Sequence, residues 1–287
     1  MKVGIMIENL GKTLRIVRKN KKVSINKIAD NYLSKSQISR FERGESEITC
    51  TRLFNILDKL NITVDEFLSL HNSHDVNFIA LIKYIREEYS LQNYKNIKKL
   101  LKNNSKFNIG TFERTMIKSI LYTVDPSFKP SNSELSELID YLFKVENFGY
   151  YEIILLGNCA YTLPYPSFFL LTKELIKNYI PSTQNKTNKK FVTQVSINCL
   201  ISSIDNKKFK NCDFLIKEIN YLLDNELNYY EKTVFHYVKG YYEYVKGMES
   251  GITKMSQAIT IFNILNEKSM LNYYTAHYKK IINGKNL

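Results

Sequence analysis

The sequence predicts an all-α protein with an N-terminal domain of five short helices and a larger helical repeat domain. Only five of its 287 residues are proline, the residue that breaks helices most strongly. Apolar residues recur three and four positions apart along most of the chain, which is the helical period, and strand-like alternation is absent. In the C-terminal two thirds, helical patterns begin about 40 residues apart, which indicates stacked helix pairs. These starts are near Tyr150, Lys190, Tyr230 and Met270.

The five short helices are predicted within residues 1–70. Their expected starts are Ile7, Ser24, Ser34, Thr51 and Thr63. A turn of three residues, Asn31 to Leu33, separates the second helix from the third. Short helices joined in this way are typical of a helix-turn-helix DNA-binding domain. We expect residues 71–75 to form a linker.

The third helix of this domain has the clearest signals at both ends. Ser34 is followed three residues later by Gln37, which is the spacing of a capping box, and Leu33 and Ile38 have the spacing of a hydrophobic staple. Gly44 suits the left-handed position just after a helix. We therefore predict a short helix over residues 34–43.

This helix has an apolar side and a polar side. At about 100° per residue, Ile38, Phe41 and Glu42 share the inward side, and Ser, Gln and Arg residues share the other. Those polar residues can bond to base edges or phosphates, although an ordinary surface helix has the same pattern. Arg18 falls on the buried face of the first helix, so we predict an Arg18–Glu42 ion pair between the two helices.

Residues 10–46 resemble the helix-turn-helix of phage-repressor-like (XRE-type) regulators. The resemblance is carried by the order S-x-S-x-I-S-x-x-E-R-G, which begins here at Ser34. It implies that the base edges are read by Ser36, Gln37 and Arg40. It implies phosphate contacts from Ser34, Lys35, Arg43 and Lys12. Arg43 also suits a purely structural role, because a cation stabilises the C-terminal end of its own helix.

Residues 76–287 are predicted to form a TPR-like α-solenoid whose concave face binds an extended peptide and whose last helices contribute to a dimer contact. Asn158 and Asn198 lie inside helical patterns, where an asparagine is favoured only if its amide is used. Either a peptide backbone or a neighbouring helix would satisfy these amides. Further groove candidates are Arg86, Lys189, Tyr237 and Tyr241, of which the tyrosines could equally pack in the core.

Composition narrows the function classes. The formal net charge of +13 favours a polyanionic partner such as DNA. The four cysteines form no CxxC pair, and the pair His71 and His74 lacks an evident third ligand, so we expect no metal site. We find no nucleophile–base pair and no glycine-rich phosphate loop, so we expect neither an enzyme nor a cofactor. No apolar run of 18 residues predicts a membrane span, and no secretory signal is evident.

Four stretches resemble the Rgg family of streptococcal-type regulators, from one end of the chain to the other. They are residues 34–67, 138–159, 184–205 and 227–247. The resemblance implies a cytoplasmic quorum-sensing regulator that binds promoter double-stranded DNA as a homodimer. It also implies that a short hydrophobic pheromone peptide binds in the repeat domain. Independently of the family, the position of Cys50 between two threonines suggests a surface thiol, which either forms an intersubunit disulfide or stays reduced in the cytosol.

Two other functions remain open at this stage. One is a phage-type repressor controlled by a protein partner, although such control does not need a repeat domain with a groove. The other is a helical-repeat enzyme modulator that uses DNA only as an anchor. Binding of short hydrophobic peptides would distinguish the peptide-responsive regulator from both.

Overall fold

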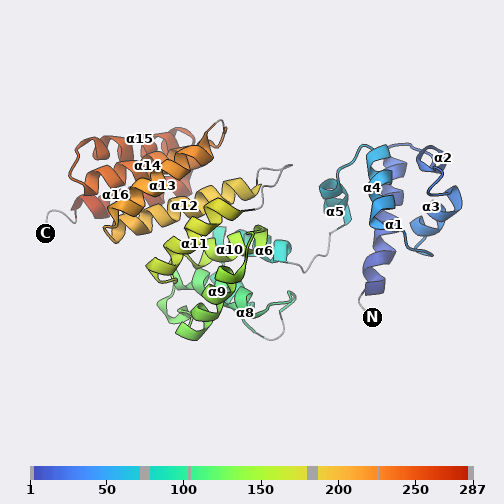
Figure 1. Ribbon diagram of the computed structural model, residues 1–287, viewed down its shortest axis with the longest axis horizontal. Coiled ribbons are helices and arrows are strands. Elements are labelled where there is room, and N and C mark those ends of the chain that lie inside the picture. The colour runs from blue at the N-terminus through green and yellow to red at the C-terminus, as the bar shows by residue number, and fades with distance from the viewer. Residues whose placement is uncertain (1–2, 72–77, 103–104, 180–186, 225, 284–287) are drawn as a thin grey trace. The chain divides into compact units, whose positions relative to one another are not determined.

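The computed structural model describes residues 3–71, 78–102, 105–179, 187–224 and 226–283 (Figure 1). Within these ranges the regular structure is helical, and the strand-like pairing amounts to one isolated bridge between Phe148 and Tyr179. The all-α prediction is therefore confirmed. The chain divides into two compact units, Met1–Ala80 and Leu81–Leu287.

The N-terminal unit contains five helices. They are α1 (Val3–Asn20), α2 (Ile25–Ile28), α3 (Lys35–Glu42), α4 (Cys50–Lys59) and α5 (Val64–His71). Ten buried apolar residues from these helices and their connections form one core, in which Leu14, Ile38 and Phe67 are completely buried. Burying one such side chain contributes roughly 1.5–3 kcal/mol, so this core supplies most of what holds the short helices together.

The predicted linker begins one residue too early. His71 is the last residue of α5, because the helix that starts after the Thr63–Glu66 capping box continues through it. His71 Nδ1 also lies 3.2 Å from Thr13 Oγ1 of α1. Residues 72–75 of that predicted linker, including His74, lie outside the described residues.

The larger unit is a succession of helices. They are α6 (Phe78–Ser90), α7 (Tyr94–Lys99), α8 (Thr111–Tyr122), α9 (Asn132–Lys144), α10 (Tyr150–Cys159), α11 (Tyr165–Asn178), α12 (Thr187–Asp205), α13 (Phe209–Leu223), α14 (Tyr229–Val245), α15 (Ser250–Ile264) and α16 (Lys268–Asn283). A 3-10 turn, η1 (Pro126–Phe128), lies where Pro126 and Pro130 interrupt the helical pattern.

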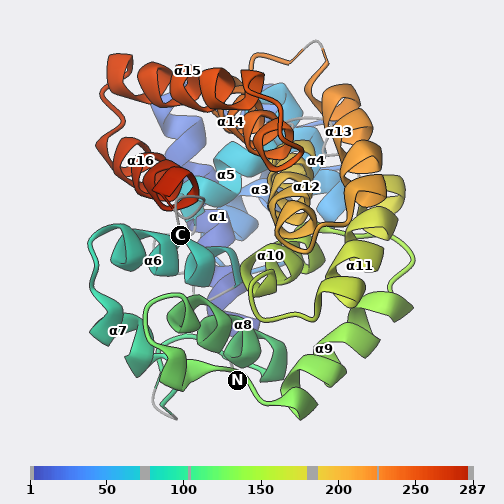
Figure 2. The same cartoon turned by 90° about the vertical axis from the view of Figure 1, so that its left-hand side faces the viewer.

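The helices of this unit form two layers, as expected of a solenoid. The series α8, α10, α12 and α14 packs side by side, each member against the next. The following helix of each pair, such as α13 after α12 or α15 after α14, packs back against its predecessor. Figure 2 shows α10 and α12 next to each other in the middle of the unit. The stacking of the repeats therefore brings residues about 40 positions apart in the sequence onto one surface.

Three of the four cysteines belong to the core of this unit. Cys159, Cys199 and Cys212 are free thiols and fully buried. Burial raises the pKa of each thiol to about 12. These cysteines therefore remain protonated at neutral pH and behave as small apolar residues.

Candidate functional site

Helix α3 has the two ends that its sequence predicts. The Ser34 amide donates to Gln37 Oε1 at 2.9 Å, and the Gln37 amide donates to Ser34 Oγ at 3.3 Å, which completes the capping box. Gly44 has a φ of 77° and accepts the left-handed conformation that ends the helix. The helix is therefore fixed at both termini by local interactions.

The position of α3 against α1 is set by the predicted ion pair, which is present. Arg18 Nε donates to Glu42 Oε1 at 2.6 Å, and Arg18 Nη2 donates to Glu42 Oε2 at 2.7 Å. Both residues are buried, with 8% and 3% of their surfaces exposed. Arg18 Nη1 also donates to the carbonyl oxygen of Val23 at 2.8 Å. One guanidinium therefore ties α1 to α3 and to the start of the second helix.

A second contact between α1 and α3 depends on a glycine. A Cβ atom placed on Gly11 would lie 1.9 Å from the carbonyl oxygen of Phe41. No side chain fits in that space, so Gly11 allows the two helix backbones to touch. This role of Gly11 could not be predicted from the sequence, because a glycine inside a helix carries no signal of which backbone approaches it.

Asp30 organises the turn before α3. Its Oδ1 accepts the backbone amides of Tyr32 and Leu33, each at 2.8 Å, and its Oδ2 accepts from Lys59 Nζ of α4 at 2.5 Å. The hydrogen bonds from Lys59 and from the Tyr32 amide lower the pKa of the Asp30 carboxyl to about 2. The turn was predicted from the sequence without a role for Asp30, although Asp at the start of a turn is a usable signal.

The residues predicted to contact DNA lie on the solvent side of the unit. All seven are exposed, namely Ser34, Lys35, Ser36, Gln37, Arg40, Arg43 and Lys12. Lys35, Ser36 and Arg40 make no side-chain hydrogen bond to the residues that the structure describes. Gln37 uses Oε1 in the capping box, which leaves its Nε2 as the group that can face a base.

Arg43 differs from the other six, because its guanidinium is already engaged. Nε and Nη2 donate to the two carboxylate oxygens of Glu45 at 2.6 and 2.8 Å, and Nη1 donates to Ser39 Oγ at 2.5 Å. A phosphate contact would have to displace Glu45. The pair is exposed, so exchanging one anion for another is feasible, and the phosphate role of Arg43 stays a prediction.

In the larger unit, three of the six predicted peptide-binding residues line one cavity. Arg86 of α6, Asn158 of α10 and Asn198 of α12 surround a volume of about 140 Å³. The Arg86 guanidinium carbon lies 5.0 Å from the centre of the Phe191 ring and makes no ion pair among the described residues. The Asn198 amide likewise has no hydrogen-bond partner in the described part of the chain.

Asn158 is partly satisfied within its own helix. Its Nδ2 donates to the carbonyl oxygen of Ile154 at 2.8 Å, and Oδ1 accepts no hydrogen bond from the residues that the structure describes. The adjacent Gly157 allows α10 to approach α12 closely, since a Cβ there would lie 3.1 Å from Val195 Cγ2. The cavity therefore offers the Arg86 cation, the Asn158 Oδ1 acceptor and both the donor and the acceptor of the Asn198 amide. Apolar side chains, such as Ile154 and Val195, line it beside them. That set can bond to a peptide backbone and a carboxylate.

The other three predicted peptide-binding residues do not line this cavity. Lys189 Nζ lies 3.0 Å from Glu226 Oε1 and is neutralised there. Tyr237 is 1% exposed, and its hydroxyl lies 2.9 Å from His277 Nδ1. Tyr241 is also buried, and its hydroxyl donates to Asp205 Oδ1 at 2.6 Å. The structure thus gives each of them a partner within the protein, which was the alternative already considered for the tyrosines.

A second cavity, of about 280 Å³, lies next to the first and shares Asn198 with it. Tyr161 and Tyr165 line it from the region after α10, and Ser202 and Asp205 line it from α12. Asp205 was not selected from the sequence, because a carboxylate at a helix end is usually no more than a solvated charge.

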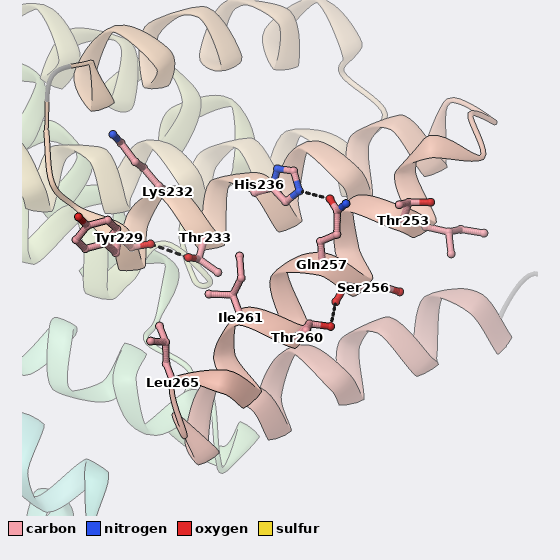
Figure 3. Close-up of a pocket in the computed structure, with 11 residues that line it drawn as sticks. Tyr229, Lys232, Thr233, His236, Thr253, Ser256, Gln257, Thr260, Ile261 and Leu265 are labelled. Atoms are coloured by element: carbon pink, nitrogen blue, oxygen red, sulfur yellow. Dashed lines mark hydrogen bonds between the residues drawn. The ribbon is translucent and has the colours of Figure 1, made fainter.

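A larger and more open groove, of about 1170 Å³, runs along α14 and α15 (Figure 3). Its apolar lining comes mainly from Ile252, Ile261 and Leu265. Figure 3 shows the side chains of His236 on α14 and Gln257 on α15 pointing toward each other, with His236 Nε2 2.9 Å from Gln257 Oε1. Ile261 and Leu265 are 37% and 57% exposed. An open apolar surface of this kind suits contact with another protein surface.

Other chemistry has less support in the described residues. No three His, Cys, Asp or Glu side chains among them are grouped so that they could hold a metal ion. None of the described helices is long and apolar enough to cross a membrane. Cys50, the first residue of α4, is a free and exposed thiol.

Comparison with known proteins places this arrangement in a family. Residues 91–276 match the family model described as the C-terminal domain of the HTH-type transcriptional regulator Rgg, and residues 14–67 match a helix-turn-helix model. The chain belongs to the Rgg family of transcriptional regulators. This membership favours a regulator over an enzyme modulator, because the family is not a class of enzymes.

Solved structures agree with the family. The SHP pheromone receptor Rgg2 of Streptococcus dysgalactiae is 52% identical, with a TM-score of 0.85 over 94% of this chain and 99% of the receptor. A Cys-to-Ser variant of that receptor gives a TM-score of 0.86 over 95% and 99% of the two chains. The complex of PrgX with cCF10 is 20% identical and has a TM-score of 0.69 over 95% of this chain and 99% of PrgX. At that identity the likeness to PrgX concerns the fold alone.

Proposed function

We propose that this protein regulates transcription as a homodimer on promoter DNA, under the control of a short hydrophobic peptide bound in the Arg86–Asn158–Asn198 cavity. The observation that carries the peptide site is that, among the described residues, Arg86 forms no ion pair and the adjacent Asn198 amide has no hydrogen-bond partner. An extended peptide exposes backbone donors and acceptors and a terminal carboxylate, which these groups complement. The similar receptor from S. dysgalactiae is described as binding a pheromone, which supports this assignment.

On the DNA side, we propose that Ser36, Gln37 and Arg40 read base edges from α3. The supporting phosphate contacts come from Ser34, Lys35, Arg43 and Lys12. One helix of this kind reads only a few base pairs, so two copies related by a two-fold axis bind two half-sites about one DNA turn apart. The positive net charge adds attraction to DNA that does not depend on sequence. Such a regulator acts in the cytoplasm and needs no catalytic activity.

For the dimer, we propose that a second copy of the chain covers the groove along α14 and α15. The groove has an exposed apolar lining, and the same patch can meet itself across a two-fold axis. Leu265→Asp places a charge in this lining and should shift the protein from dimer to monomer in sedimentation velocity. Leu170→Asp is the matched control, because Leu170 is 49% exposed on α11 and lies outside the groove. A Leu265→Asp protein that stays dimeric would remove this surface from the dimer.

For Cys50, we propose a disulfide that links the two copies of this dimer. An exposed thiol on α4 could join its counterpart in the second copy when the protein is exposed to air. Non-reducing gels of protein taken directly from cells and of air-exposed protein test this. A dimer band that is removed by reductant supports the disulfide, and the absence of such a band in both samples rules it out.

The peptide-responsive function is tested by binding. Short synthetic hydrophobic peptides should bind the full-length protein at micromolar concentration or below. A bound peptide should change either the affinity of the protein for promoter DNA or the conformation of the protein on that DNA. Arg86→Gln and Asn198→Ala should each lower the affinity for the peptide. Neither substitution should change the affinity for DNA when no peptide is present. If no hydrophobic peptide binds at micromolar concentration, the proposed peptide control is wrong.

A further inference from the structure

One face of α12 lines both cavities of the larger unit. Phe191, Val195 and Asn198 line the first cavity, and Asn198, Ser202 and Asp205 line the second. Successive members of this series are three or four residues apart, so they lie along one side of the helix. Asn198 lines both cavities, so the two adjoin at this residue and together mark a path along α12.

The two ends of this path carry opposite charges. At one end Arg86 lies over the Phe191 ring, with a guanidinium that forms no ion pair among the described residues. At the other end stands Asp205, the last residue of α12. Its carboxylate accepts one hydrogen bond, from Tyr241, and has no ion-pair partner in the described part of the chain.

The surroundings of Asp205 favour an added cation. The C-terminal end of a helix carries a partial negative charge, so a carboxylate there adds to the potential that attracts a cation. His277 of α16 interacts electrostatically with Asp205, but burial lowers the pKa of its imidazole despite the opposing effect of that carboxylate. His277 is therefore neutral at neutral pH and does not balance the carboxylate.

We propose that Asp205 binds the free N-terminal ammonium group of the regulatory peptide, so that the peptide runs along α12 from Asp205 towards Arg86. This assignment rests on the proposed peptide-binding function and adds a direction to it. The carboxylate end of the peptide lies at Arg86, and the free amide of Asn198 bonds to the backbone between the two ends. Lys189 does not compete for the carboxylate end, because Glu226 already neutralises it.

The same geometry limits the length of the peptide. Phe191 and Asp205 are fourteen residues apart on α12, which corresponds to roughly 21 Å at the helical rise. An extended chain covers about 3.3 Å per residue, so about six or seven residues span that path. A much shorter peptide cannot reach both charged groups at once.

The test uses heptapeptides of Leu, Ile, Val and Gly, so that the only charges are those of the two termini. A pool of these peptides is first screened on the full-length protein, and the best binder is then compared in its free, N-acetylated and C-amidated forms. Acetylation should weaken binding about tenfold or more, as expected for the loss of a charge-assisted hydrogen bond. If a peptide binds and acetylation has no effect, the assignment of Asp205 is wrong while the peptide-binding function stands.

A double-mutant cycle assigns the effect to Asp205. In Asp205→Asn the free peptide should bind about tenfold more weakly, and acetylation should cause little further loss. The asparagine can still accept the Tyr241 hydrogen bond, and a thermal melt checks the fold. Asp213→Asn is the matched control, because Asp213 accepts from Tyr242 at 2.5 Å outside both cavities.

Arg86→Gln completes the test. It should abolish the effect of C-amidation and retain the full effect of N-acetylation. If N-acetylation weakens peptide binding to Asp205→Asn as much as to the wild type, the proposal is overturned. It is also overturned if Asp213→Asn changes peptide binding in the same way as Asp205→Asn. Failure of every heptapeptide to bind would overturn the proposed peptide function and this direction with it.

Discussion

Arg18 of α1 and Glu42 of α3 share two hydrogen bonds, at 2.6 and 2.7 Å, in the interior of the N-terminal unit. The pair lies directly behind the exposed face of α3 that is proposed to read bases. Two parallel N–H···O bonds fix orientation as well as distance. The pair therefore sets the angle at which α3 is presented, although neither residue is positioned to contact a base.

Removal of one partner should be strongly destabilising. Glu42→Ala leaves the Arg18 guanidinium buried without its counterion, which typically costs about 3–5 kcal/mol. Denaturant unfolding of the N-terminal unit, followed by circular dichroism, measures the change. Glu45→Ala is the control, because the Arg43–Glu45 pair is half exposed, and a solvent-exposed ion pair contributes little to stability. Equal effects of the two substitutions would show that burial of the first pair is energetically unimportant.

Gly11→Ala should separate α1 from α3. The added methyl group would lie 1.9 Å from the Phe41 carbonyl oxygen, and a backbone atom cannot move aside as a flexible side chain can. We expect the free energy of unfolding to fall by about 1–3 kcal/mol or more, the usual cost of overpacking. Binding to DNA should also be weaker.

Gly110→Ala is the comparison for this substitution. Its Cβ would meet only the movable Glu113 carboxylate. Thermal unfolding and DNA titration of both variants check the expectation. A Gly11→Ala protein with normal stability would mean that α1 and α3 can shift without cost.

The N-terminal unit shows why some features could be predicted from sequence and others could not. The capping box of Ser34 and Gln37 depends on residues three apart, and the Arg18–Glu42 pair follows from two charges on faces that the helical period already turns inward. Gly11 and Asp30 act instead on backbone groups or side chains about 30 residues away. The contact at Gly11 and the Asp30–Lys59 pair depend on how the helices pack, which no local pattern contains, whereas the turn bonds of Asp30 are local.

The same distinction holds in the repeat unit. Asn158 and Asn198 could be found because asparagine is a costly choice inside a helix, and both line a cavity. Lys189 has the same charge as Arg86, and only the packing of α12 near Glu226 shows that it is neutralised. Asp205 stands out only when the cavity, the helix end and the neutral His277 are known together.

The stability of the helix-turn-helix should depend on pH through Asp30. Its pKa is about 2 in the folded protein, below the ordinary value for an aspartate in the unfolded chain, because Lys59 and the Tyr32 amide stabilise the carboxylate. The carboxylate thus contributes stability above about pH 4, and this contribution is lost as the pH falls towards 2.

Asp30→Asn isolates this contribution. The variant keeps an oxygen acceptor for the turn amides but loses the charge that pairs with Lys59. Its melting temperature should be lower than that of the wild type at pH 5 to 7, and the difference should shrink as the pH falls from 4 to 2. A difference that stays constant down to pH 2 would contradict the lowered pKa.

Base reading by Gln37 requires a substitution that spares the helix end. Gln37→Ala removes the capping box as well as the side chain, so a loss of binding would have two causes. Gln37→Glu keeps an acceptor for the Ser34 amide, since Glu and Gln both complete a capping box, but replaces the Nε2 donor with an acceptor. Duplexes selected from a random pool by the wild-type protein serve as the specific DNA, and unselected duplexes serve as the non-specific DNA.

The expected result is a loss of specificity. Gln37→Glu should weaken binding to the selected duplexes by about 1–3 kcal/mol more than binding to the unselected ones, because the lost donor faces a base. Lys35→Gln is the control, since the loss of a phosphate contact weakens both kinds of DNA alike and reduces the salt dependence of binding. If Gln37→Glu lowers both affinities equally, as the new negative charge alone would do, Gln37 does not read a base.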